Sequence, residues 1–462
     1  MDLPTAHAAS AAPMPSSAPL TPSQRIAYAT ARLPRYTSYP TALQFGALDS
    51  ATFQEWLSET GPDDRLSLYV HIPFCKTLCW YCGCHTGVTR SRTRIARYAQ
   101  ALARESELLA RALPPSAGVE HLHFGGGSPD ALGAEDLARL LGTLRAQFDL
   151  RPGAEIAAEL DPRNLDRATV SALAQGGLTR ASLGVQDIAP EVQALIGRVQ
   201  PEDLVVASID RLRDAGVGAI NLDIMYGLPG QSIAHVEATA RFVAAQGAAR
   251  VAAFGYAHVP WMRRNQNAID TALLPGAADR LRQADAIEAT LLAEGYVTVG
   301  MDHFARPDDP LARAAATGTL RRNFQGYTTD EAPILLPLGA SAIGRTPRGF
   351  AQNEPDERRW LAAVEAGRLA TARGLAVTPD DRIRGALIET IMCAGAIARD
   401  AVPPGILAEV MPRLAGLMAD GLVVDDGVRL SSTAEGIRLL RHFAACFDAY
   451  LPTAGGRHSA AA

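Results

Sequence analysis

Lysine is almost absent from this sequence of 462 residues: Lys76 is the only one, and arginine provides every other basic side chain. No apolar run approaches the roughly 20 residues needed to cross a bilayer, so we expect no membrane span. The net charge of −5 gives no support for a nucleic-acid partner or a membrane surface. The Ala-, Pro- and Ser-rich N-terminal segment lacks the basic start and apolar stretch of a secretory signal. These absences favour a cytoplasmic protein.

Cysteine is also scarce, but it is concentrated in one place. Four of the six cysteines lie within ten residues, at Cys75, Cys79, Cys82 and Cys84, whereas Cys393 and Cys446 lie far away. The spacing C-x3-C-x2-C matches neither the bacterial ferredoxin run nor the paired C-x2-C motifs of zinc ribbons. Three thiolates on a four-iron cluster leave one iron open to another ligand. A disulfide scaffold does not suit so long a chain, but a zinc site that includes Cys84 remains an alternative.

The surroundings of the cysteines favour an iron–sulfur site. Phe74, Trp80 and Tyr81 place aromatic rings next to the thiolates, which suits a cluster shielded from water. The strand-like run Leu66–Ile72 directly precedes the cysteines and would deliver them to the carboxyl edge of a sheet. Enzymes with alternating strands and helices place their chemistry at that edge.

Short apolar runs alternate with longer amphipathic stretches from Leu66 onward. The expected strands are Leu66–Ile72, Glu120–Phe124, Glu155–Leu160, Arg180–Val185, Ala219–Met225 and Val251–Tyr256, with a further one at Tyr296–Gly300. The expected helices between them are Thr93–Ala112, Ala134–Gln147, Asp166–Gln175, Pro201–Ala215 and Ile233–Ala245. This alternation predicts parallel strands with right-handed crossovers, and six units suit an incomplete barrel.

The sequence pattern changes near Gly344. Helices are expected at Asp356–Thr371, Pro379–Ala394, Pro404–Ala419 and Thr433–Leu451, with a strand pair at Leu422–Asp425 and Gly427–Leu430. Helices followed by a small strand pair resemble a winged helix. Asp420, Asp425 and Asp426 make this wing acidic, which argues against DNA binding. A lid or packing domain is the better interpretation.

Several separated motifs resemble one family. They are Arg35–Thr41, the block Tyr69–Cys84, Gly125–Pro129, Gly184–Asp187, Asp223–Gly230, Met301–Pro307 and Asn323–Thr329. Together they resemble the radical S-adenosylmethionine (SAM) enzymes and, among these, the oxygen-independent coproporphyrinogen III oxidases. The resemblance extends from about Arg35 to about Leu451. It implies an α/β fold, a partial (β/α)6 radical SAM barrel with a mostly helical, winged-helix-like C-terminal domain.

The resemblance also implies the chemistry. Such enzymes convert two propionates of coproporphyrinogen III to vinyl groups, giving protoporphyrinogen IX in haem biosynthesis. They use a 4Fe–4S cluster and two SAM molecules per chain, and act through a 5′-deoxyadenosyl radical. The expected partners are this substrate, an unidentified electron donor and an unidentified acceptor. The protein is expected to be a cytoplasmic monomer.

These expectations divide the chain into five parts. A disordered tail is expected at residues 1–30, an N-terminal closing segment at 31–60 and the catalytic barrel at 61–345. A helical lid domain is expected at 346–455, followed by a second disordered tail at 456–462.

The resemblance assigns most site residues. Cys75, Cys79 and Cys82 would hold the cluster, whereas the role of Cys84 is open. Taken alone, Glu159 is as often a structural hydrogen-bonding group as a functional carboxylate, and Arg198 reads as a solvated helix residue. By resemblance, SAM is bound by Tyr69, Tyr81, Gly126, Gly127, Ser128, Glu159, Gln186, Arg198, Asp223, Ala257 and Ile343.

A substrate with four carboxylates calls for cations, since guanidinium groups pair with carboxylates in a bidentate manner. The candidates lie in or beside the motifs at both ends of the chain: Arg35, His303, Arg306, Arg321 and Arg322. An alternative is a haem chaperone or another haem-related radical SAM protein. A non-enzymatic metal scaffold is a second alternative, but it would not need polar residues at so many strand ends.

Overall fold

The computed structural model describes residues 20–451. The tail expected at 456–462 and most of the tail expected at 1–30 therefore lie outside the described residues. The last part of the N-terminal expectation is wrong, because Pro22–Thr30 forms helix α1. Thr21 and Gln24 form a capping box around its first turn, and Pro22 occupies a first-turn position, where its missing N–H costs nothing.

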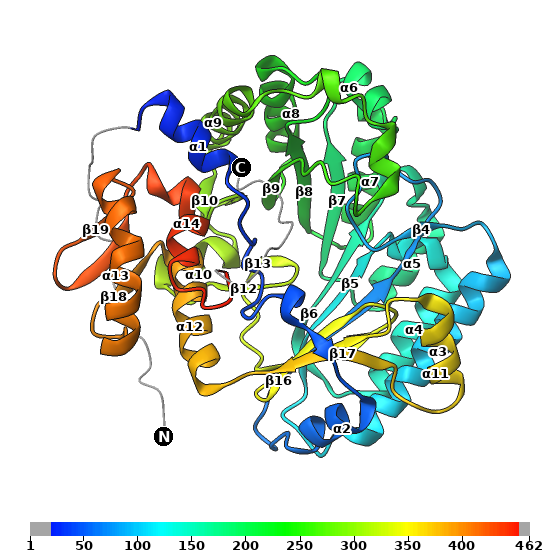
Figure 1. The fold of residues 1–462 in the computed structure, drawn as a ribbon. Helices are drawn as coiled ribbons and strands as arrows, with labels where there is room; N and C mark the ends of the chain where they lie inside the picture. Colours follow the sequence, from blue (N-terminus) through cyan, green and yellow to red (C-terminus); the bar gives the residue numbers. More distant parts are fainter. Residues whose placement is uncertain (1–19, 452–462) are drawn as a thin grey trace.

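Six parallel strands form the centre of the main sheet, as the alternation predicts (Figure 1). In spatial order they are β2 (Leu66–Ile72), β5 (Val119–Gly126), β6 (Leu150–Leu160), β7 (Arg180–Gln186), β8 (Ala219–Tyr226) and β9 (Arg250–Gly255). Each pairs in parallel with the next. All six carboxyl ends therefore meet at the same edge, where the predicted site residues should gather.

Further strands extend the sheet on both sides. Beside β2 lie the parallel strand β14 (Ile334–Leu338) and then the antiparallel strands β15 (Ile343–Thr346), β16 (Gly349–Asn353), β17 (Thr371–Ala376) and β1 (Gly46–Ala47). Beside β9 lie the antiparallel strands β11 (His303–Ala305) and β10 (Val297–Val299). The strand expected at Tyr296–Gly300 is thus present as β10. The sheet continues past residue 345, where the sequence placed the end of the barrel.

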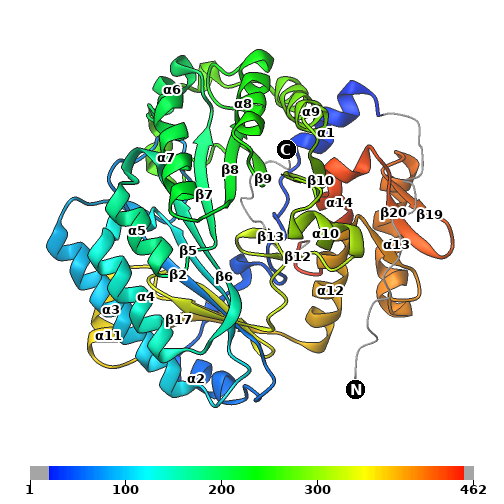
Figure 2. The same cartoon turned by 180° about the vertical axis from the view of Figure 1, so that it is seen from behind.

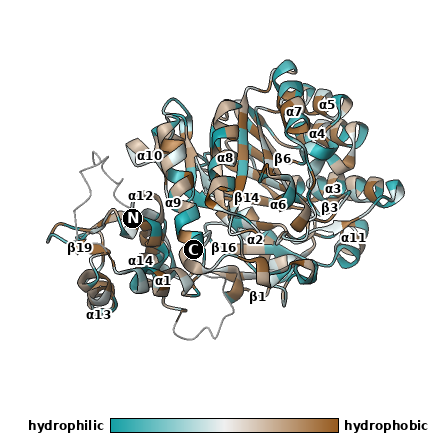
Figure 3. Cartoon of the chain, turned by 90° about the horizontal axis from the view of Figure 1, so that it is seen from above, coloured by the Kyte–Doolittle hydropathy of each residue, from teal (hydrophilic) through white to brown (hydrophobic). Residues whose placement is uncertain are grey.

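Helices pack against the outer face of the parallel strands (Figure 2). They are α3 (Arg92–Ala112), α4 (Ala134–Gln147), α5 (Arg167–Gln175), α7 (Glu202–Asp214), α8 (Ile233–Ala245) and α9 (Ala277–Ala293). Leu102, Leu144 and Ile209 are almost completely buried between helices and sheet. Figure 3 shows hydrophobic residues along the strands and hydrophilic ones on outward helix turns. This burial, rather than helix propensity, stabilises the layers.

Shorter elements complete the barrel side. They are α2 (Ser50–Ser58), β3 (Phe74–Cys75), β4 (Gly87–Val88), α6 (Pro190–Leu195), α10 (Pro310–Thr317), the hairpin β12 (Arg321–Asn323) with β13 (Gly326–Thr328), and α11 (Glu357–Glu365). The helix expected at Asp356–Thr371 is therefore too long. It ends at Glu365, and the chain continues into β17, which pairs with β16.

The C-terminal part has its own apolar core. It contains α12 (Pro379–Ala394), α13 (Pro404–Ala419), a sheet of β18 (Ala396–Ala398), β20 (Arg429–Ser432) and β19 (Val423–Asp425), and α14 (Leu440–Ala445). The expected wing is present, but the helix expected at Thr433–Leu451 is confined to α14 and a preceding 3-10 turn. Within residues 20–451, no helix has both the length and the apolar character needed to cross a membrane.

Candidate active site

The cysteine loop begins at the carboxyl end of β2. Cys75 lies on β3, which pairs in parallel with β4, and the Thr89 N–H donates to the Cys75 carbonyl at 3.2 Å. Cys79 is buried, Cys75 and Cys82 are half-buried, and Cys84 is exposed. All of these thiols are free, so the disulfide alternative is wrong for them.

Hydrogen-bonding groups surround the sulfur atoms of the three motif cysteines. The Thr86 hydroxyl lies 3.2 Å from Cys75 Sγ. Arg163 and Arg198 each place a guanidinium nitrogen 3.3 Å from Cys79 Sγ. The backbone N–H of Cys84 donates to Cys82 Sγ at 3.4 Å.

Donors aimed at sulfur are typical of thiolates that ligate iron, where they stabilise negative charge and tune the potential. Within the described residues, no three Cys, His, Asp or Glu side chains converge closely enough for a single metal ion. The donor set therefore fits a cluster held by Cys75, Cys79 and Cys82 better than a zinc ion. Cys84 contributes a backbone donor to this arrangement.

A short segment after β9 clamps the cysteine loop. The Asn265 amide donates to the carbonyls of Cys79, Trp80 and Cys82 at 3.2, 3.1 and 2.9 Å. Gln266 donates to the Tyr81 carbonyl at 2.8 Å and to the Ala257 carbonyl at 3.1 Å. Sequence reasoning missed this clamp because amide side chains in a loop have no recognisable spacing.

Glu159 lies at the end of β6 among groups from neighbouring strands. His123 Nε2 is 3.1 Å from Glu159 Oε1, and the His123 ring stacks on Tyr69 at a centroid distance of 6.0 Å. Burial alone would raise the pKa of Glu159, but the hydrogen bond with His123 and the Gly126 N–H hold it below its ordinary value. This carboxylate is thus kept ionised, as a group facing a cationic ligand should be.

Arg198 connects the cysteine loop to the ends of β6 and β7. Only 6% of it is exposed, so the solvated-helix interpretation is wrong. Besides Cys79 Sγ, its guanidinium donates to the Gly184 carbonyl at 2.7 Å and lies 3.4 Å from an Asp161 oxygen. Gln186 lies beside this group, with a positive φ of 67°.

Asp223 lies on β8 and accepts hydrogen bonds from Ser182 at 3.2 Å. Burial raises the pKa of Asp223 to about 7, with the nearby Glu159 charge adding to the effect. Two carboxylates in one buried site repel each other, which a cationic ligand between them would relieve.

The glycine turn after β5 allows a close approach of backbone to the cysteine loop. A Cβ at Gly127 would lie 2.5 Å from the Phe74 carbonyl oxygen, so no larger residue fits. Gly126 has a φ of 110°, which side chains rarely adopt. Ser128 is buried and donates to Asp130.

The other predicted SAM residues lie around the same edge. Tyr81 packs against the apolar cluster of Val192, Ile196, Leu228, Tyr256 and Ile269. Ala257 follows β9, and Ile343 begins β15 on the far side of β14. The structure therefore brings the predicted residues to the carboxyl ends of the strands, with Ile343 at the margin.

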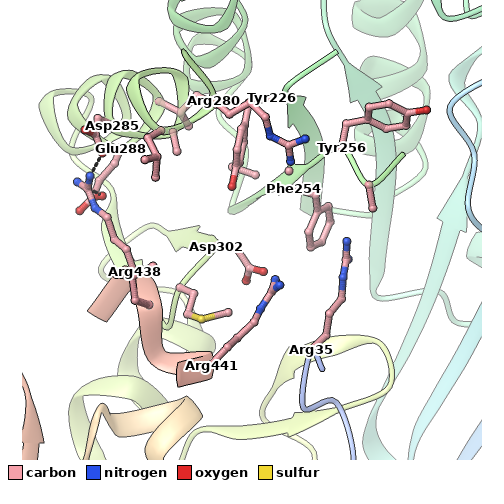
Figure 4. A pocket seen from close by; sticks show the side chains of 18 of the residues that line it. Arg35, Tyr226, Phe254, Tyr256, Arg280, Asp285, Glu288, Asp302, Arg438 and Arg441 are labelled. Atoms are coloured by element: carbon pink, nitrogen blue, oxygen red, sulfur yellow. Dashed lines mark ion pairs between the residues drawn. The ribbon is translucent and has the colours of Figure 1, made fainter. Parts of the chain in front are cut away.

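A cavity of about 380 Å³ lies between the end of β9, α9 and α14. Arg35, Arg280 and Arg441 point into it from three different segments, with Tyr226 beside Arg280 and Asp302 beside Arg441 (Figure 4). Ala257 also lines it, so the cavity adjoins the strand-end site.

The charged side chains around this cavity form two groups. On one side, Arg438 pairs with Asp285 and with Glu288 at 2.6 Å, and Arg25 pairs with Glu435 at 2.5 Å. On the other side, Arg35, Arg280 and Arg441 line the cavity together, and Asp302 lies near Arg441.

Electrostatics confirm that cations are crowded on this side. Burial, reinforced by Arg35, lowers the pKa of Arg441 to about 10. Burial would raise the pKa of Asp302, yet His303, Arg322 and Arg441 hold it far below its ordinary value. An anionic ligand would relieve the repulsion between these guanidinium groups.

The residues predicted to bind the substrate do not lie in a single cavity. Arg35 lines the cavity. His303 points into the barrel interior, 2.7 Å from Asp302. Arg321 pairs with Glu389 at 3.0 Å and, like Arg322, lines a neighbouring cavity beside α12.

Arg306 does not join them. Its backbone N–H donates to the Ala249 carbonyl, before β9 begins, and its side chain stacks 4.1 Å from the Tyr296 ring centroid. This is the opposite end of β9 from the cavity, so the motif position was misleading.

Sequence reasoning missed Arg280 and Arg441. Both lie in helical segments whose pattern gave no functional signal. The one available sign in the sequence was a cation within the largely apolar run Leu439-Leu440-Arg441-His442-Phe443. In the structure, Arg441 is only 9% exposed.

Comparison with known proteins agrees with this arrangement. Residues 69–243 match the family model of the Radical SAM superfamily. The oxygen-independent coproporphyrinogen III oxidase of Bradyrhizobium diazoefficiens is 44% identical over 443 residues, covering 94% of this chain and 98% of that protein. The enzyme of the same name from Escherichia coli (strain K12) is 40% identical over 431 residues, covering 90% and 93%.

A solved structure shares the fold over the same extent. The coproporphyrinogen III oxidase from Escherichia coli, described as a radical SAM enzyme, superposes with a TM-score of 0.86 at 38% identity. The match covers 90% of this chain and 97% of that one, so it includes the barrel and the C-terminal part. On this combined similarity of sequence and fold, the chain belongs to the oxygen-independent coproporphyrinogen III oxidases, within the radical SAM superfamily.

Proposed function

We propose that this protein converts two propionate side chains of coproporphyrinogen III to vinyl groups without oxygen, giving protoporphyrinogen IX for haem biosynthesis. The observation that carries the proposal is the cavity into which Arg35, Arg280 and Arg441 point, next to the strand-end site (Figure 4). Guanidinium groups recognise carboxylates with two parallel hydrogen bonds. The apolar lining from Phe254, Phe304 and Trp261 suits the body of a tetrapyrrole.

Cys75, Cys79 and Cys82 are proposed to hold the 4Fe–4S cluster, with one iron left for SAM. When bound, these groups supply the one-electron chemistry of radical SAM enzymes. The chain supplies the surroundings: Thr86, Arg163 and Arg198 stabilise thiolate charge, and Tyr81 shields the site from water.

The carboxylates at the strand ends are proposed to orient SAM. Glu159 and Asp223 would face its sulfonium and ribose, while the Gly126–Ser128 turn allows close backbone approach. Two SAM molecules per chain are part of this proposal, as the family resemblance implies, with candidate residues from β2 to Ala257 and Ile343.

The arginines are proposed to position the propionates so that one of them faces the strand-end site. Arg322 supports Arg35 from behind, since its Nη2 donates to the Arg35 carbonyl at 3.3 Å. Two other nitrogens of Arg322, Nε and Nη1, are buried without a hydrogen-bond partner among the described residues. A buried donor of this kind is costly unless a ligand or water satisfies it.

The remaining expectations are part of the same proposal. The protein would act as a cytoplasmic monomer with a separate electron donor and acceptor. The C-terminal part would close the cavity as a lid, since α14 contributes Arg441 and the segment before it contributes Arg438.

The test is anaerobic turnover. The reconstituted protein is incubated with coproporphyrinogen III, SAM and dithionite, and the products are oxidised and separated. We expect protoporphyrin IX, together with methionine and 5′-deoxyadenosine. Haem binding without any decarboxylated product would instead support the haem-chaperone alternative.

A further inference from the structure

Several exposed apolar side chains lie on or beside the cysteine loop. Trp80 is 39% exposed, Val199 is 64% exposed and Met262 is 59% exposed, although large apolar side chains are usually buried. Each belongs to the loop or to a segment in contact with it. The Trp80 N–H donates to the Ile196 carbonyl at 2.9 Å, and a Cβ at Gly197 would lie 2.9 Å from its indole.

Met262 is connected to the loop through its neighbour. Arg263 donates to the Gly83 carbonyl at 2.8 Å, next to the Asn265 clamp. Directly behind this surface lies Cys79, whose Sγ accepts a hydrogen bond from Arg198, the residue before Val199. One layer of residues therefore separates solvent from the cluster ligands at this place.

The surface also has a cationic side on a protein whose net charge is −5. No Asp or Glu occurs between Asp64 and Glu105, or between Glu237 and Asp270, the two stretches that contain the loop and its clamp. Lys76 and Arg264 are exposed there. Asp166, before α5, lies close enough to Lys76 to interact with its charge, and Glu202 and Asp203 begin α7 shortly after Val199.

We propose that Trp80, Val199 and Met262, with Arg264 at the rim, form the docking surface for a small acidic electron-carrier protein. We call this set the carrier face. It rests on the proposed cluster: one electron passes from the reduced carrier to the cluster, and the carrier is oxidised by one electron. An apolar centre with charges at the rim is the usual anatomy of a transient interface, and the rim charge governs the rate of association.

The position of the carrier face suits this role. The loop lies on the side of the barrel away from α12 and α13 (Figure 1). The carrier face borders the arginine cavity at Met262, because the preceding residue, Trp261, lines that cavity.

The experiment measures cluster reduction rather than turnover. Reconstituted protein is mixed anaerobically with photoreduced flavodoxin, an acidic carrier, and bleaching of the cluster's visible absorption is followed by stopped flow. We expect Val199→Glu, Met262→Glu and Arg264→Glu each to slow reduction by about tenfold, and higher salt to slow the wild type. Reduction by dithionite, which needs no docking, should be unchanged.

The matched controls are Val428→Glu and Arg313→Glu, which change an exposed apolar residue and an exposed arginine on elements of the opposite side. Flavodoxin should reduce the clusters of both control variants at the wild-type rate. The proposal is overturned if the three variants are reduced by flavodoxin as fast as the controls. It is also overturned if dithionite reduction slows equally, or if light scattering shows a dimer that these substitutions dissociate. A protein without visible cluster absorption would refute the proposed cofactor instead.

Discussion

The cysteine loop and the arginine cavity are built in opposite ways. The loop takes all of its candidate ligands from ten consecutive residues, whereas the cavity takes Arg35, Arg280 and Arg441 from three distant segments. The loop is fixed by backbone hydrogen bonds from Asn265 and Gln266, while the cavity is bounded by side chains of elements with separate cores.

The difference shows that a cluster site constrains the spacing of residues in the sequence, whereas a carboxylate site constrains only the positions of side chains in the folded protein. A cluster needs ligands at fixed short distances, which a local motif can provide. A carboxylate needs a cation at the right point, and any segment that folds to that point can supply it. Five experiments test this contrast, beginning with the largest expected effect.

The cluster ligands should be separable by single substitutions. We expect Cys75→Ser, Cys79→Ser and Cys82→Ser to abolish cluster assembly, because each removes one of three ligands. Cys84→Ser should largely retain it, since the donor from Cys84 to Cys82 Sγ is a backbone N–H. Visible absorption and iron content after anaerobic reconstitution give the answer. Equal loss in all four variants would mean that Cys84 is also a ligand.

The arginines of the cavity should affect substrate and not cofactor. Arg441→Ala should weaken binding or turnover of coproporphyrinogen III by about 2–5 kcal/mol, because a charge-assisted pair with a propionate is lost. Mispositioning should also let a three-carboxylate intermediate accumulate. Arg306→Ala is the matched control and should behave as wild type, since Arg306 lies at the other end of β9. Equal kinetics in both variants would remove Arg441 from the site.

The barrel side contains a buried carboxylate whose contribution to the free energy of unfolding should depend on pH. Glu105 of α3 accepts hydrogen bonds from the Gly339 N–H, Asn353 and Trp360. Burial raises its pKa to about 7 despite these donors. Between its ordinary pKa of 4.5 and about 7, the folded state therefore binds more protons than the unfolded state.

The free energy of unfolding should accordingly fall by about 3 kcal/mol as pH rises through that window. Chemical denaturation of Glu105→Gln and wild type at several pH values measures the difference. The variant has no ionisable group there, so this contribution should vanish and leave a constant offset. An identical pH dependence in both proteins would show that Glu105 titrates normally.

The clamp on the cysteine loop should stabilise the cluster. Asn265→Ala removes the hydrogen-bond donor for three carbonyl groups. We expect the folded conformation of the loop to be destabilised by about 1–3 kcal/mol. The measurement is the rate of iron loss to a chelator. Asn267→Ala, two residues away and exposed, serves as the control. No difference between the two variants would mean that the loop holds its shape without the clamp.

The smallest effect is expected at the wing. Its β19–β20 turn contains Asp425 and Asp426, so phosphate contacts should be unfavourable. Binding to random duplex DNA at low salt should be negligible in a filter or anisotropy assay. Salt-sensitive micromolar binding would restore a regulatory interpretation of this part.

The same contrast explains what the sequence could predict. The six parallel strands followed from the alternation of apolar runs and amphipathic stretches, and Glu159 stood out at a strand end, whereas Asp223 was assigned by the family resemblance. The end of α11 was misjudged because the apolar residues after Glu365 suit either a helix or the strand β17, and only pairing with β16 decides. Arg280 and Arg441 could not be found, since their function depends on α9 and α14 coming to lie around the same cavity. Arg306 was chosen for its motif, but the antiparallel direction of β11 turns it away.

The most direct test of the account is a crossed measurement on two variants, Cys79→Ser and Arg441→Ala. Iron content and the affinity for coproporphyrin III, the stable oxidised analogue, are determined for each by absorption and fluorescence titration. The account predicts that Cys79→Ser loses iron but binds the porphyrin as wild type does. Arg441→Ala should retain iron and lose porphyrin affinity. Loss of both properties in both variants would contradict the separation of cluster and carboxylate sites.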